Sequence, residues 1–105
     1  MSDFVRVARV TEIPDPGRKL VEVLDRLIVV FHAAGHFYAL DDVCTHDGGP
    51  LGEGEVEGFA VACPRHGARF DIRNGGVLSM PATKPTVAHE VKVVGDEVLV
   101  KLNES

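Results

Sequence analysis

The chain has 105 residues, 45% of them hydrophobic and 26% charged, a composition that suits one globular domain with a modest core. Its formal net charge of −5 argues against a nucleic-acid partner, because binding to phosphate backbones requires a basic face. The longest purely aliphatic or aromatic run, Leu27 to Phe31, is too short to span a bilayer, and Met1-Ser2-Asp3 lacks a basic leader pattern. We therefore expect no membrane association and a cytoplasmic location.

Both ends of the chain are predicted to form β-strands, because they combine β-branched residues with partial alternation of apolar and polar side chains. A hairpin is expected around Asp25-Arg26, and a second one around Gly95-Asp96. At most one short helical turn is expected, near residues 11–16. In chain order, the expected strands of the two ends cover residues 4–10, 19–24, 27–33, 37–40, 91–94 and 97–102.

Residues 41–86 differ in composition from the two ends of the chain, because glycines and prolines are frequent and only residues 57–62 and 68–72 resemble strands. Glycine permits the tight turns and the close backbone approach that a metal-binding loop needs. We therefore predict an all-β sandwich or small barrel, built from about residues 1–40 and 87–105. A lobe of about residues 41–86, with the composition of a ligand-binding region, would be inserted into it, and the whole chain 1–105 would be one domain.

Two short stretches carry the candidate metal ligands. Cys44 and His46 lie in the first stretch and Cys63 and His66 in the second, giving the pattern C-x-H-x16-C-x2-H, which includes both cysteines of the chain. Two sulfur and two nitrogen donors suit zinc or an iron–sulfur cluster. Small zinc modules usually bring both cysteines on one arm and both histidines on the other, whereas here each arm brings one of each. That split suits a [2Fe–2S] centre in which two histidines replace two cysteines on one iron.

The two stretches and their surroundings resemble the cluster-binding loops of Rieske proteins. The resemblance is carried by C-T-H and C-P-x-H-G, followed by Arg69-Phe70-Asp71, with Phe37 to Leu40 before the first stretch and Pro81 to Pro85 after the second. Within that family, the chain is most similar to the small ferredoxins that serve bacterial aromatic-ring dioxygenases, such as those acting on biphenyl. The resemblance implies one Rieske [2Fe–2S] cluster, with Cys44 and Cys63 on one iron and His46 and His66 on the other.

The same resemblance implies a one-electron carrier rather than an enzyme. It would accept electrons from an NAD(P)H-dependent flavin reductase and pass them to a terminal ring-hydroxylating oxygenase, docking transiently near His46 and His66. High-potential relatives carry hydroxyl groups at the positions of Ala68 and Phe70, so we expect a reduction potential at the low end of the Rieske range. The alternatives are a Rieske-like small subunit of a larger enzyme, such as nitrite reductase, and a zinc-stabilised interaction module.

The remaining candidates have structural interpretations. His32, His36 and His89 are interpreted as surface residues, which leaves no histidine pair for a mononuclear iron site. Arg69 and Asp71 are close enough in sequence to form a local ion pair. Leu51 is expected to pack inside the lobe.

Overall fold

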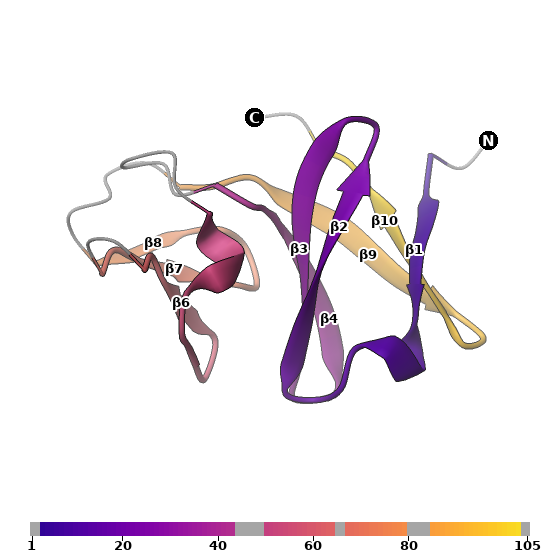
Figure 1. Cartoon of the computed structure of the whole chain (residues 1–105), viewed down its shortest axis with the longest axis horizontal. Coiled ribbons are helices and arrows are strands. Elements are labelled where there is room, and N and C mark those ends of the chain that lie inside the picture. Colours follow the sequence, from indigo (N-terminus) through magenta and orange to yellow (C-terminus); the bar gives the residue numbers. More distant parts are fainter. Residues whose placement is uncertain (1–2, 44–49, 65–66, 80–84, 104–105) are drawn as a thin grey trace.

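The computed structural model describes residues 3–43, 50–64, 67–79 and 85–103 (Figure 1). These residues form a nearly all-β structure with two turns of 3-10 helix, η1 (Val10–Glu12) and η2 (Leu51–Glu53). Among them, no helix has the length and hydropathy needed to span a membrane. The strands are β1 (Val5–Arg9), β2 (Gly17–Val23), β3 (Arg26–Ala33), β4 (His36–Asp41), β5 (Val56–Glu57), β6 (Ala60–Ala62), β7 (Arg69–Asp71), β8 (Val77–Ser79), β9 (Ala88–Val94) and β10 (Glu97–Lys101).

The larger sheet is built from both ends of the chain. Its strand order is β1-β10-β9-β4-β3-β2, and every neighbouring pair is antiparallel. The two edge strands, β1 and β2, also contact each other, so the sheet curls towards a closed barrel. The predicted all-β class and the predicted pairing of the chain ends are therefore confirmed.

A second, smaller sheet is inserted in the sequence between β4 and β9. Its order is β5-β6-β7-β8, again antiparallel, and Figure 1 shows it beside the larger sheet with η2 between them. We call η2 and β5–β8 the inserted lobe. The boundaries at residues 41 and 86, and the treatment of residues 1–105 as one domain, remain predictions.

Two separate cores follow from the alternation of side chains along β3. Ile28 and Val30 point into the curled sheet, where they pack with residues such as Val98. Val29 and Phe31 point the other way and pack with Leu51 and other residues of the inserted lobe. Both faces of β3 are thus buried, which explains why its sequence is a continuous apolar run rather than a strict alternation.

The structure corrects four details of the sequence interpretation. The β2–β3 turn consists of Leu24-Asp25 rather than Asp25-Arg26. The expected strand 57–62 is interrupted at Gly58, whose φ of +61° starts a turn, and β8 was not expected at all. His89 was interpreted as a surface residue, but its side chain is 0% exposed, because β9 pairs with β4 and places the ring beside Asp41.

Candidate metal centre

Cys63 begins the loop that joins β6 to β7. Its backbone N–H donates to the carbonyl of Ala68 over 2.6 Å, and the N–H of Gly67 donates back to the Cys63 carbonyl over 2.9 Å. Gly67 has a φ of +75°, a left-handed conformation that glycine adopts without strain. The loop is therefore closed tightly at its base by backbone bonds, which fixes the position of the cysteine backbone.

The cysteine is buried against apolar residues. Cys63 is 2% exposed and belongs to the same packed group as Leu51, Ala68 and Phe70, each of which is 0% exposed. The predicted packing role of Leu51 is confirmed. Ala68 and Phe70 provide no hydroxyl group on this wall, as the sequence indicated.

The chain enters its first candidate ligand stretch from an anchored position. The N–H of Asp42 donates to the Leu27 carbonyl over 3.0 Å, and the Thr86 hydroxyl donates to the Val43 carbonyl over 3.3 Å. The Asp42 carboxylate in turn accepts from the N–H of Gly52 in η2. The residues directly before Cys44 are therefore tied to β3, to η2 and to the segment leading into β9. Sequence reasoning did not identify Asp42 or Thr86, because neither belongs to a local motif.

The inserted lobe is joined to the larger sheet at Gly54. A Cβ at this position would lie 1.7 Å from the carbonyl oxygen of Ala62, so only glycine fits. The guanidinium of Arg18 on β2 donates a hydrogen bond to the Gly54 carbonyl. These contacts set the distance between η2, β6 and β2, and they hold the Cys63 loop in a fixed relation to the larger sheet.

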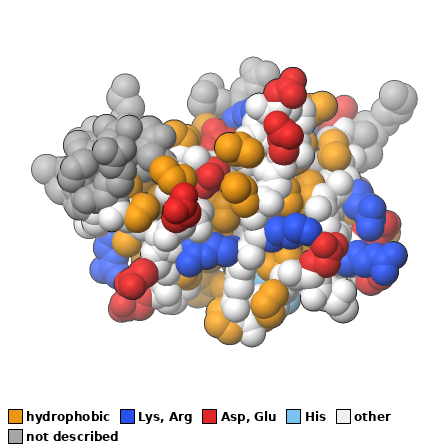
Figure 2. Space-filling view, viewed as in Figure 1, with side chains coloured by type: hydrophobic (Ala, Val, Ile, Leu, Met, Phe, Trp, Pro, Cys, Tyr) orange, Lys and Arg blue, Asp and Glu red, His pale blue; other side chains and the backbone are white. Residues whose placement is uncertain are grey.

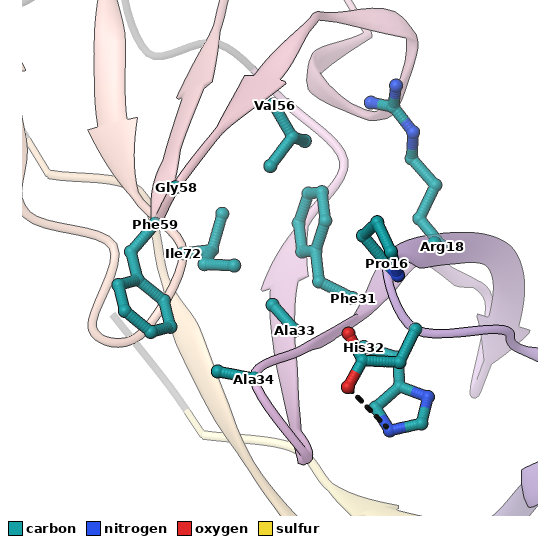
Figure 3. A pocket seen from close by; sticks show the side chains of 12 residues that line it. Pro16, Arg18, Phe31, His32, Ala33, Ala34, Val56, Gly58, Phe59 and Ile72 are labelled. Carbon is teal, nitrogen blue, oxygen red and sulfur yellow. Dashed lines mark ion pairs between the residues drawn. The ribbon is translucent and has the colours of Figure 1, made fainter.

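A cleft of about 560 Å³ separates the two sheets on the side of the β5–β6 turn (Figure 3). Its walls are mainly apolar, with Phe31 of β3 facing Val56 and Ile72 of the lobe. At its edge, the Asp15 carboxylate lies 3.7 Å from Nε2 of His32. The His32 Nδ1 donates to the Ile13 carbonyl over 2.7 Å, which explains this half-buried histidine as part of the fold rather than as a metal ligand. Cys63 is not among the described residues that line the cleft, so the cleft is separate from the candidate metal centre.

Of the four predicted ligands, the structure describes Cys63; Cys44, His46 and His66 lie outside the described residues. What is described fits an iron–sulfur group. A thiol is the donor that iron–sulfur clusters require, and Cys63 presents it at the base of a tight loop against an apolar wall.

The described residues define a small all-β protein in which a lobe, inserted into a curled antiparallel sheet, places a buried cysteine at the base of a hairpin loop. Residues 3–101 of the chain match the Rieske [2Fe-2S] domain family. The chain is 38% identical over 99 residues to the 3-phenylpropionate/cinnamic acid dioxygenase ferredoxin subunit of Photorhabdus laumondii, an alignment covering 93% of each protein.

Solved structures of dioxygenase ferredoxins have a fold similar to that of this chain. The ferredoxin of carbazole 1,9a-dioxygenase from Nocardioides aromaticivorans superposes with a TM-score of 0.92 at 29% identity, covering 97% of this chain and 100% of that one. A ferredoxin in complex with the reduced oxygenase of carbazole 1,9a-dioxygenase gives a TM-score of 0.89 at 29% identity, covering 96% of this chain and 94% of that one.

The chain belongs to the Rieske [2Fe-2S] domain family. Its cofactor is a Rieske-type [2Fe–2S] cluster, and it is a ferredoxin-type electron carrier rather than a catalytic component. Family membership decides between the cluster and the zinc alternative, and the ferredoxin relatives favour the carrier over the nitrite reductase type of subunit.

Proposed function

We propose that this protein carries single electrons from an NAD(P)H-dependent flavin reductase to the terminal oxygenase of an aromatic-ring-hydroxylating dioxygenase system. The observation that carries the proposal is the match along nearly the whole chain to a dioxygenase ferredoxin subunit, 38% identical over 93% of both proteins. A cytoplasmic location belongs to the proposal, since reduced thiols are the normal state of cysteines there.

Within this proposal, Cys44, His46, Cys63 and His66 hold the cluster, and partners approach near His46 and His66. When bound, a cluster of this type takes up and releases one electron. The residues of the chain set how readily it does so. The wall formed by Ala68 and Phe70 is buried and apolar, so it donates no side-chain hydrogen bond that would favour the reduced state. We therefore propose a reduction potential at the low end of the Rieske window, which runs from roughly −150 to +300 mV.

The function is tested by following electrons between purified components. The protein is reduced anaerobically with dithionite and mixed in a stopped-flow instrument with the oxidised terminal oxygenase of a 3-phenylpropionate/cinnamic acid dioxygenase. We expect the absorption spectrum of this protein to return to that of the oxidised state while the oxygenase becomes reduced. A protein that is reduced fully but transfers nothing to this oxygenase contradicts the proposal.

The ligand assignment has its own test, which does not depend on a partner. His66→Ala should abolish the rhombic EPR signal of the dithionite-reduced protein, because an iron would lose a ligand. His36→Ala is the matched control, since His36 is an exposed histidine on the larger sheet. A full Rieske-type signal in the His66 variant would show that the assignment is wrong.

A further inference from the structure

Three leucines of the β2–β3 hairpin are exposed to solvent. Leu20 is 52% exposed, Leu24 76% and Leu27 54%. Single exposed apolar residues are ordinary on protein surfaces, but several large ones gathered on one hairpin indicate a surface that another molecule covers.

Leu24 is the most unusual of the three. It occupies the two-residue loop between β2 and β3, where Leu24 and Asp25 have φ angles of 50° and 68°. Positive φ at both positions is the pattern of a type I′ turn, which favours asparagine, aspartate and glycine. A leucine here is strained by its Cβ and is also exposed to water. The positive φ and the exposed apolar side chain of Leu24 both destabilise the isolated fold. We therefore infer that the Leu24 side chain contacts another molecule.

The register of the hairpin puts Leu20 and Leu27 on the face of the sheet that the inserted lobe covers, while Leu24 lies in the turn at the end of the hairpin. Leu20 pairs with Val29, and Glu22 pairs with Leu27, so these four side chains share one face of the sheet. Further along this face, Val29 is covered by the lobe and packs with Leu51. Leu20 and Leu27 thus continue the lobe surface onto the hairpin, and Figure 2 shows hydrophobic side chains over this part of the hairpin.

The same face is linked to the first cluster-binding stretch. The Leu27 carbonyl accepts the hydrogen bond from Asp42, two residues before Cys44. A partner that covers Leu27 therefore meets the chain at the point where it enters that stretch. This position matters, because electron transfer requires the partner to approach the cluster closely.

The charged groups around the leucines are mainly acidic. Glu22 lies opposite Leu27, Asp25 follows Leu24, and Glu53 lies in η2, which packs against β2; all three are exposed. Of the nearby cations, Arg26 is paired with Asp41, whose two carboxylate oxygens accept from one guanidinium nitrogen at 2.9 and 3.0 Å, and Arg18 bonds to the Gly54 carbonyl. This surface complements an apolar recess bordered by lysine or arginine.

We propose that Leu20, Leu24 and Leu27 form a docking surface for the terminal oxygenase, which receives them in an apolar recess with a basic rim. The proposal rests on the proposed function and adds a second contact region to the one near His46 and His66. We choose the terminal oxygenase as the partner because, in the solved carbazole 1,9a-dioxygenase complex, a ferredoxin 29% identical to this chain is bound to the oxygenase.

The test compares matched variants in the stopped-flow assay described above. Leu24→Asn should lower the second-order rate constant of electron transfer to the oxygenase about tenfold at limiting oxygenase concentration, and Leu20→Thr should lower it several-fold. Val94→Thr is the control, because Val94 is 54% exposed but lies at the far end of β9, next to the β9–β10 turn. The EPR signal, the midpoint potential and the rate of reduction by a flavin reductase should remain unchanged in every variant.

The outcomes separate this proposal from the proposed function. If the wild-type protein passes no electrons to the oxygenase, the proposed function fails and this docking surface with it. If the wild-type protein transfers electrons and the leucine variants match it, only the docking surface is wrong. The docking surface for the oxygenase is also wrong if the leucine variants slow only the reduction of this protein by the reductase. It is wrong as well if sedimentation shows a dimer that Leu24→Asn dissociates, while the rate of electron transfer to the oxygenase stays the same.

Discussion

His89 is the centre of a buried polar network that joins three strands to the end of the chain. Its Nε2 lies 2.7 Å from Oδ1 of Asp41, and its Nδ1 lies 2.9 Å from the backbone nitrogen of Asn103. A backbone N–H can only donate, so Nδ1 is the acceptor and Nε2 carries the proton that Asp41 accepts. The Asp41 carboxylate also accepts from Arg26. Because Asp41 is the last residue of β4, this network fixes the end of that strand shortly before Cys44.

We predict that His89→Ala lowers the free energy of unfolding by about 2 kcal/mol, because Asp41 and the Asn103 N–H lose a buried partner. Urea unfolding at pH 7, followed by far-ultraviolet circular dichroism, measures the change. His36→Ala, which removes an exposed ring, should stay within about 0.5 kcal/mol of the wild type. Equal stability of the two variants would mean that the network contributes nothing.

Ala68 is the residue at which the potential can be tested. Ala68→Ser places a hydroxyl donor on the buried wall that Ala68 shares with Cys63. A hydrogen bond to a charged group is worth about 1.5 kcal/mol, so we expect the midpoint potential to rise on the order of 60 mV. Redox titration followed by EPR measures it, with Ala88→Ser on β9 as the control. A lower potential in the Ala68 variant would contradict the role given to this wall.

At the scale of the elements, the turn between β7 and β8 is organised by Asp71 rather than by a pair between Arg69 and Asp71. Asp71 bonds to the backbone N–H and to the guanidinium of Arg73, at 2.9 Å and 2.8 Å respectively, whereas Arg69 lies 3.9 Å from Glu57. The predicted Arg69–Asp71 ion pair is therefore wrong. The spacing from Asp71 to Arg73 lets one carboxylate bind both the turn backbone and the side chain.

The hydrogen bond from Arg73 lowers the pKa of Asp71 below its ordinary value of 3.8, against the opposing effect of burial. A carboxyl whose pKa is lower in the folded state stabilises the fold above its ordinary pKa, and this stabilisation is lost as the pH falls through the lowered value. We predict that Asp71→Asn lowers the midpoint of thermal unfolding at pH 7, and that the difference from the wild type shrinks below about pH 4. Calorimetry from pH 3 to 7 measures it, with Glu90→Gln, an exposed carboxylate on β9, as the control. A difference that is constant with pH would contradict the prediction.

At the scale of the whole molecule, the two cores separate the inserted lobe, which packs with Cys63, from the interior of the larger sheet. Cys63 belongs to the core between the lobe and the outer face of the larger sheet. The core inside the curled sheet contains Ile28, Val30 and Val98 but neither Cys63 nor any residue of the lobe. The larger sheet can therefore keep its own core when the lobe loosens.

We predict that removal of iron by an anaerobic chelator loosens the inserted lobe but leaves the larger sheet folded. Backbone amides of residues 51–79 should exchange about tenfold or more faster, because ligand binding and lobe folding are coupled. Amides of β3, β4, β9 and β10 should keep their protection. Hydrogen exchange followed by mass spectrometry compares the two forms; a uniform loss of protection over the whole chain would show that the two cores unfold together.

Much of the architecture is predictable from the sequence because its signals are local. Period-two patterns and turn residues give the hairpin 91–102 and most strands of the larger sheet, and the glycine-rich middle marks the inserted part. β8 lies outside the expected strands, because its three residues pair with β7 only in the folded lobe, and the expected strand 57–62 includes only Glu57 of β5.

The family resemblance could be recognised before the fold was known, because the two cysteine–histidine stretches and their flanking residues are local features of the chain, and that resemblance implied the cluster. The burial of polar groups and the placing of exposed side chains, in contrast, depend on pairing between distant segments and follow from the folded chain. His89 is buried because β9 pairs with β4, some 50 residues away in the chain, and no local pattern reports that pairing. Leu20 and Leu27 share a face with Val29, which the lobe covers, for the same reason: the packing of β3 against the lobe depends on contacts between distant segments.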